Sequence, residues 1–267
     1  MYETLETSRH GGLAQITLNR PELHNAFNSV LVRELTHVLE AIEHDLSVHA
    51  VLLAGAGKSF CAGADTGWMR GMAAASEPEN REDALHLARM LRLLNFLSKP
   101  TLARVHGAAY GGGIGLVACC DIAIGAESAT FALSEVKLGL APATISTYVM
   151  AAIGTRQARR LFVTGEVFDA ARAAEIGLLH ECVPDADLDA TIERVLRALH
   201  RAGPQARLEA KRLALRVAGM DEHQAGKLDA RNAELIARMR VGEEGQEGLS
   251  AFLDKRKPAW LADQDPT

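Results

Sequence analysis

The chain has 267 residues, and its 29 Lys and Arg against 34 Asp and Glu give a formal charge of −5. This balance offers no basic field for nucleic acid or for an anionic membrane surface. A hydrophobic share of 48% beside a charged share of 24% excludes general disorder. The sequence shows neither a long apolar span nor a signal-like start, and its four cysteines form no CxxC pair. We therefore expect a cytoplasmic protein with no metal site, no redox cofactor and no disulfide framework.

Short apolar runs alternate with longer helical patterns in the first half of the chain. Asn28 is a candidate N-cap, because the apolar residues that follow it recur at helical spacing. Strands are expected at 14–18, 50–54, 101–105, 122–126 and 130–133, and further helices at 83–97 and 114–120. This alternation predicts an α/β fold with mostly parallel strands.

The pattern changes after about residue 145, where helical periodicity dominates. Helices are expected at 151–163, 170–176, 188–202, 205–217 and 225–240. Gly203 and Pro204 interrupt this pattern, so we divide the chain into a core over residues 1–200 and a helical subdomain over residues 201–267. The second part is too small to bury a core alone, and we expect it to pack on its own core or on a neighbouring subunit.

Two glycine- and alanine-rich segments follow predicted strands. The first, SFCAGAD, covers residues 59–65, and the second, VHGAAYGGGIG, covers residues 105–115 and leads into a helix. Small residues at such turns leave backbone N–H groups free to donate to a ligand. Two convergent donors would form an oxyanion hole. The alternative interpretation is close packing of helix against sheet, which requires small residues as well.

Glu135 is a lone carboxylate in the apolar stretch LSEVKLGLAP at residues 133–142. Burial there would raise its pKa into the range that general acid–base chemistry uses. An ion pair with Lys137 or an exposed turn is the alternative. His37, His44 and His49 lack metal-ligand spacing and are expected at the surface.

Taken together, the segments resemble the crotonase superfamily, the enoyl-CoA hydratase/isomerase proteins. Besides the segments quoted above, NRP at 19–21 and FLDKRKPAW at 252–260 carry the resemblance, in the same order and spacing over nearly the whole chain. The resemblance implies a repeated ββα core with a helical C-terminal subdomain. It also implies acyl-CoA thioester substrates, coenzyme A entering only with the substrate, and a homo-oligomer that is a trimer or a dimer of trimers.

The resemblance implies that the N–H groups of Ala62 and Gly112 hold the thioester oxygen while Glu135 handles protons. Hydratases of the family usually have a second glutamate at the position of Gly115. Asp65, Tyr148 or a water are the alternatives for this missing carboxylate.

The resemblance also assigns substrate contacts outside these three residues. Arg20 and Lys58 are candidates for the CoA phosphates, and Phe252 and Lys255 for the adenine end. Further contacts are expected at Ala26, Ala64, Asp65, Gly111, Gly115 and Pro142.

Three functions are compatible with these features. The stretches at 101–124 and 133–146 look like bacterial methylglutaconyl-CoA hydratases, which favours hydration of a branched or carboxylated enoyl-CoA such as 3-methylglutaconyl-CoA. Lys137, Arg156 and Arg70 are candidates for binding a distal carboxylate. Gly115 instead favours a Δ3,Δ2-enoyl-CoA isomerase with a single glutamate. A non-catalytic member that binds RNA or protein is disfavoured by the negative charge.

Overall fold

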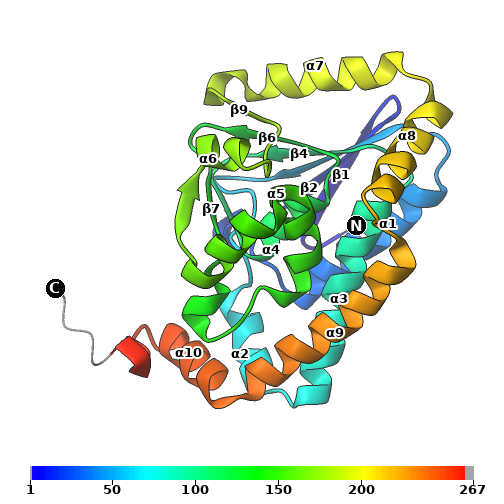
Figure 1. Cartoon of the computed structure of the whole chain (residues 1–267). Helices are drawn as coiled ribbons and strands as arrows, with labels where there is room; N and C mark the ends of the chain where they lie inside the picture. The colour runs from blue at the N-terminus through cyan, green and yellow to red at the C-terminus, as the bar shows by residue number, and fades with distance from the viewer. Residues whose placement is uncertain (1, 262–267) are drawn as a thin grey trace.

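The structure, a computed structural model, describes residues 2–261 and contains two sheets (Figure 1). The larger sheet has six strands in the order β1-β2-β3-β4-β6-β9, and the smaller has three in the order β5-β7-β8. The strands are β1 (Leu5–His10), β2 (Leu13–Leu18), β3 (Ala50–Gly55), β4 (Thr101–Val105), β5 (Ala108–Tyr110), β6 (Ile122–Ala126), β7 (Thr130–Ala132), β8 (Val167–Asp169) and β9 (Glu181–Val183).

Ten helices surround these sheets in the described part of the chain. They are α1 (Ser29–His44), α2 (Thr66–Ala74), α3 (Glu77–Phe96), α4 (Gly112–Cys119), α5 (Ala143–Thr164), α6 (Ala170–Glu175), α7 (Leu188–Arg201), α8 (Pro204–Val217), α9 (Glu222–Val241) and α10 (Glu243–Leu253). The predicted α/β class with mostly parallel strands is confirmed, since β2, β3, β4, β6 and β9 pair in parallel while β1 joins β2 antiparallel.

The larger sheet lies between two apolar layers. On one face, Leu52, Leu102 and Ile124 pack against Leu188 and Ile192 of α7, which crosses the sheet at the top of Figure 1. The opposite face contributes to the main core, to which α1, α3, α4 and α5 supply buried side chains. Burial on both faces explains why β3 is a continuous apolar run.

The chain repeats one arrangement three times between β3 and α5. A strand of the larger sheet is followed by a strand or bridge of the smaller sheet and then by a helix. The first repeat runs from β3 through a bridge at Cys61 to α2, the second from β4 through β5 to α4, and the third from β6 through β7 to the 3-10 helix η2 (Ser134–Leu138) and α5. This is the repeated ββα core that the family resemblance implied.

Two predicted helices start much earlier than expected, and two helices, α2 and α10, were not predicted. Helix α3 begins at Glu77 because Ser76 and Glu79 form a capping box there. Helix α5 begins at Ala143 and contains a break at Gly154, where φ is 73°. Of the two, α2 has Asp65 as its N-cap, whose side chain accepts the Trp68 N–H at 2.7 Å.

The last helices pack on the chain's own first part. Helix α9 runs along α3, side by side in orange and cyan in Figure 1, and α10 contacts α2 and η2. A second apolar cluster joins these elements through Met69, Met72, Ile236 and Leu249. The C-terminal helices therefore close one side of the cavity described below.

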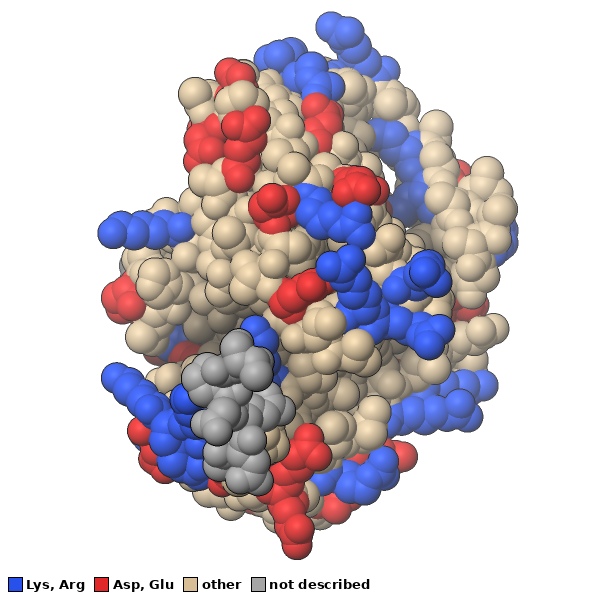
Figure 2. All heavy atoms as spheres, turned by 60° about the vertical axis from the view of Figure 1, so that its left-hand side comes forward, with Lys and Arg blue, Asp and Glu red and all other residues tan. Residues whose placement is uncertain are grey.

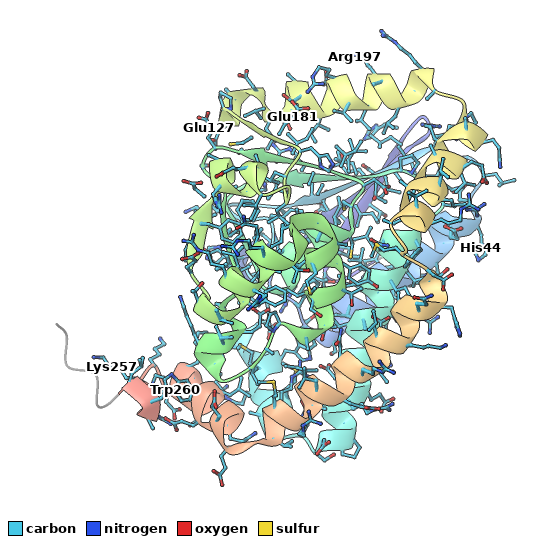
Figure 3. All side chains as sticks on the ribbon, viewed as in Figure 1. His44, Glu127, Glu181, Arg197, Lys257 and Trp260 are labelled. Carbon is cyan, nitrogen blue, oxygen red and sulfur yellow. The ribbon has the colours of Figure 1, made fainter. Side chains whose placement is uncertain are left out.

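The outer surface carries both signs of charge. Figure 2 shows Lys and Arg interspersed with Asp and Glu over one face of the molecule. His37, His44 and His49 are exposed as predicted, with His44 at the end of α1 in Figure 3. Among residues 2–261, no helix combines the length and apolar character that a membrane crossing needs.

Candidate active site

In each of the three repeats, a short segment leads from the smaller sheet to the following helix. These three segments lie next to one another. Cys61 is bridged in parallel to Ala109 of β5, and β5 pairs in parallel with β7. The segments that leave these three positions are therefore neighbours, because parallel strands end on the same side. They carry Ala64, Gly112 and Glu135, and all three residues line one cavity of about 370 Å³.

The turn at Gly111 and Gly112 depends on glycine. Gly111 has φ of +47°, and a Cβ on it would lie 3.0 Å from Oε1 of Glu135. A Cβ on Gly112 would lie 2.4 Å from Cε2 of the buried Phe27 ring. Gly112 is the first residue of α4, so its N–H has no partner within the helix. This turn therefore offers a backbone donor at a helix N-terminus beside a carboxylate.

The Ala62 N–H is not free, which corrects the sequence-based assignment. It donates to the carbonyl oxygen of His24 at 3.0 Å. Two residues later, the bridge between Phe27 and Ala64 uses the Asp65 N–H and the Gly63 carbonyl. The N–H of Ala64 donates to no protein group within residues 2–261. Ala64, rather than Ala62, is thus the available donor in this segment.

Arg20 and Asp65 are engaged with each other rather than with the cavity. Their side chains, each 12% exposed, form an ion pair with Nη2 and Oδ2 separated by 2.7 Å. Arg20 also donates to the Ala26 carbonyl oxygen, and neither Arg20, Ala26 nor Asp65 lines the cavity. Arg20 is therefore not a free phosphate ligand, and all three residues instead hold the turn that carries Ala64.

Asn25 holds the loop that follows the NRP motif at residues 19–21. It is fully buried, accepts the Arg20 N–H at 2.9 Å, and donates to the carbonyl oxygens of Ala56 at 2.8 Å and Ser59 at 2.7 Å. These bonds tie the loop before α1 to the segment that leads to Ala64. Sequence reasoning attached no role to this side chain, because its partners are far along the chain.

Glu135 lies in η2 with its carboxylate at the Gly111 turn. Its Oε2 has no contact with solvent and no hydrogen-bond partner in the described structure. Burial raises the pKa of Glu135 from 4.5 to about 7. A carboxyl group with this pKa can both accept and return a proton near neutral pH. The alternative of an ion pair with Lys137 is not observed within residues 2–261.

The raised pKa of Glu135 predicts a pH-dependent effect on folding. The folded chain binds the Glu135 proton more tightly than the unfolded chain, so the penalty for burying the charge is absent below pH 4.5 and complete above pH 7. Because glutamine carries no charge, we expect Glu135→Gln to be more stable than the wild type at pH 8 by up to about 3 kcal/mol. The advantage should vanish near pH 4.5, and urea unfolding at a series of pH values measures it.

Glu127→Gln is the matched control for this experiment, since Glu127 is exposed. It should show no comparable change of stability between pH 5 and pH 8. A stability difference for Glu135→Gln that stays constant across this range would contradict the assigned burial of the charge.

Gly115 does not line the cavity, contrary to its predicted substrate contact. A Cβ there would lie 2.5 Å from Cγ2 of Ile145 and 3.5 Å from Cδ2 of Leu91. No glutamate fits at this position while Ile145 stays in place. Tyr148 is 1% exposed and lies outside the cavity lining, as does Asp65. Glu135 is the only carboxylate among the cavity-lining residues that the structure describes.

Several predicted ligands lie away from the cavity. Lys58, Lys255, Arg70 and Arg156 are exposed and are not among the lining residues. Gly111, Pro142, Phe252 and Lys137 do line it, and their contact with a substrate stays a prediction. Figure 3 shows Lys257 and Trp260 beyond α10, at the outer edge of the molecule.

Most of the apolar cavity wall was missed by sequence reasoning. It comes from α2, α3, α9 and α10, through Trp68, Met69, Met72, Leu87, Ile236 and Leu249. The methionines in the stretch after Asp65 were a usable signal, because a helical interpretation would have placed Met69 and Met72 on one face. The contribution of α9 and α10 depends on long-range packing and has no local signal.

Comparison with known proteins shows the family of this chain. The family model described as enoyl-CoA hydratase/isomerase matches residues 8–263. The chain belongs to this family. It is 30% identical to a crotonyl-CoA hydratase of Syntrophomonas wolfei, covering 98% of this chain and 99% of the relative. Identity to a short-chain-enoyl-CoA hydratase of Clostridium acetobutylicum is 33%, covering 93% and 94%. The crystal structure of an enoyl-CoA hydratase from Shewanella pealeana matches with a TM-score of 0.79 and 44% identity, covering 97% of this chain and 96% of that one.

Family membership confirms the expected crotonase fold. In this family member, the three turns meet at one cavity, which among residues 2–261 is lined by one carboxylate, Glu135, and by Ala64 and Gly112, whose N–H groups donate to no described protein group. The side of the cavity formed by α9 and α10 belongs to the same chain.

Proposed function

We propose that this family member adds water across the 2,3 double bond of an enoyl-CoA thioester. The observation that carries the proposal is the position of the Glu135 carboxylate beside the Gly111 turn, in a cavity that Ala64 and Gly112 also line. The relatives named crotonyl-CoA hydratase and short-chain-enoyl-CoA hydratase support the reaction at this general level.

In the proposed reaction, the thioester oxygen accepts hydrogen bonds from the Ala64 and Gly112 N–H groups. Glu135 takes a proton from water while the water oxygen bonds to C3, and the π electrons move toward the thioester oxygen. The resulting enolate is stabilised by the two fixed donors. Glu135 then returns its proton to C2, so hydroxyl and hydrogen add to the same face. One carboxylate suffices, because the proton it removes is the proton it delivers.

We assign the CoA portion to the cavity mouth around Phe252, Lys137 and Arg256. Phe252 is 48% exposed, which leaves its ring accessible for the adenine. Lys137 is exposed and forms no ion pair with the described residues, so its charge is available for a phosphate. Arg256 is held by Glu247, whose two carboxylate oxygens accept from Nη1 at 2.6 Å and Nη2 at 2.7 Å.

The finer proposal is a branched or carboxylated substrate such as 3-methylglutaconyl-CoA, in leucine breakdown. A Δ3,Δ2-enoyl-CoA isomerase is the second candidate, favoured by Glu135 being the only carboxylate among the described lining residues. Such an isomerase needs one base to move a proton between carbons, and no second carboxylate to activate water.

Turnover of purified protein on three substrates separates these functions. Hydration of crotonyl-CoA and 3-methylglutaconyl-CoA, followed by loss of absorbance of the conjugated thioester, is the expected result. Faster hydration of the second substrate would support the finer proposal. Migration of the double bond of a 3-enoyl-CoA without any hydration would replace the hydratase with the isomerase. Glu135→Gln, assayed in parallel, excludes a contaminating activity.

We also propose a cytoplasmic homo-oligomer, either a trimer or a dimer of trimers. Leu213 and Val217 on α8 are 52% and 79% exposed, and a neighbouring copy would cover such side chains. Cys119 and Cys120 are buried free thiols, in keeping with a reducing compartment.

A further inference from the structure

One cationic side chain on the cavity wall is buried. Arg240 lies near the end of α9, one turn after Ile236, and both residues line the cavity. The residue is 6% exposed, whereas the other cations of the lining, Lys137 and Arg256, are much more accessible. Burial of an arginine is costly unless its charge and its donors are satisfied.

The hydrogen bonds of Arg240 leave much of its guanidinium unused. Nη1 donates to Oδ2 of Asp83 at 3.1 Å and to the side-chain oxygen of Asn80 at 3.2 Å. Nε and Nη2 donate to no group in the part of the chain that the structure describes, and Nε has no contact with solvent. A guanidinium has five N–H donors, two of them on Nη1. The remaining donors therefore lack a protein acceptor.

The partners of Arg240 are themselves fixed. Oδ1 of Asp83 accepts the Trp68 Nε1–H at 2.9 Å, and the Asn80 side chain donates to the Met72 carbonyl oxygen at 2.9 Å. These contacts hold the guanidinium by one nitrogen and orient the rest before any ligand arrives. Burial lowers the pKa of Arg240 while Asp83 opposes this effect, and an arginine remains charged at neutral pH in either case.

The wall near Arg240 is otherwise apolar. Trp68, Met69, Met72, Ile236 and Leu249 belong to the same lining. With the thioester placed at Glu135, the acyl chain would extend along this apolar wall. A guanidinium in the wall would then suit only an acyl chain whose far end is polar. Charge-assisted hydrogen bonds are stronger in such a water-poor environment. The Asp83 side chain is 22% exposed, so solvent screens part of its negative charge.

We propose that Arg240 binds a carboxylate at the far end of the acyl group, and so selects acyl-CoA substrates that carry one. Nη2 has two N–H donors that no described protein group accepts, and a carboxylate has two oxygens that can accept them, whereas Nε is covered by protein atoms. The inference rests on the proposed function, since it takes the cavity as the acyl site. It replaces the sequence-based candidates Lys137, Arg156 and Arg70 with a residue that sequence reasoning did not single out.

Binding of saturated thioesters tests this proposal without catalysis. Calorimetry would compare glutaryl-CoA, which ends in a carboxylate, with pentanoyl-CoA, which has the same chain length and ends in methyl. We expect the wild type to prefer glutaryl-CoA. In Arg240→Met the ratio of the two affinities should fall about 10- to 100-fold, the value of a hydrogen bond to a charged group.

Two further variants separate recognition from damage to the fold. Asp83→Asn combined with Arg240→Met removes the buried charge pair together and should show the same loss of preference. Arg156→Met is the matched control at an exposed arginine outside the cavity, and its affinity ratio should equal that of the wild type.

The outcomes for the inference and for the proposed function are distinguishable. An affinity ratio that is unchanged in Arg240→Met, or a wild type that prefers pentanoyl-CoA, would overturn the role of Arg240, even if crotonyl-CoA were hydrated. A preference for glutaryl-CoA that depends on Arg240 would uphold it, even if no enoyl-CoA were turned over.

Discussion

Replacing Glu135 with glutamine should lower kcat for hydration of an enoyl-CoA by about a thousandfold, the scale of a general acid–base group. Glutamine keeps the size of the side chain but can neither remove a proton from water nor return one to C2. The two backbone donors remain, so binding of the thioester should change little. Steady-state kinetics with crotonyl-CoA measures kcat, and calorimetry with a saturated acyl-CoA measures binding.

Glu127→Gln is the matched control, because Glu127 is exposed on the outside of the molecule near β9 (Figure 3). Its kcat should equal that of the wild type. If Glu135→Gln retained more than about a tenth of the wild-type kcat, another group would have to handle the proton, and the proposed mechanism would be wrong.

Removing the Ala64 N–H should cost about 100- to 1,000-fold in kcat, as expected for one oxyanion donor. The change is made by incorporating lactic acid in place of Ala64, which turns the amide into an ester and leaves the side chain intact. The enolate then loses a fixed donor that water cannot replace at the same geometry. Substrate binding should weaken far less, because the donor matters most when charge develops on the oxygen.

The same ester at Ala62 is the control, because the Ala62 N–H is already donated to His24. There we expect a loss of roughly 1 kcal/mol in stability and only a small change in kcat. Each ester also weakens one carbonyl acceptor, that of Gly63 in one case and that of Cys61 in the other. A large drop in kcat at Ala62 with none at Ala64 would restore the assignment made from sequence.

Local features were predictable because they depend on neighbours in the chain. Asn28 caps α1 as expected, with its Oδ1 accepting the Leu31 N–H at 2.8 Å. The apolar run at β3 and the glycines before α4 also indicated the observed elements. Glu135 stood out as a carboxylate among apolar residues, and its Oε2 is buried in the structure.

Hydrogen-bond partners that are distant in sequence could not be predicted in this way. Whether Ala62 or Ala64 has a free N–H depends on where the His24 carbonyl lies. The ion pair between Arg20 and Asp65 likewise forms only when the loop that carries Arg20 packs against the segment that carries Asp65.

The sequence by itself determined the α/β core, the glycine turn and the lone Glu135, because periodicity, capping and turn chemistry act over a few residues. The resemblance to the family's hydratases added that Gly115 stands where they usually have a glutamate. Only the tertiary structure decided why no carboxylate fits there, since Ile145 fills the space. It alone decided that Arg240 reaches the cavity wall, because α9 must first pack along α3 and α10 must close over α2.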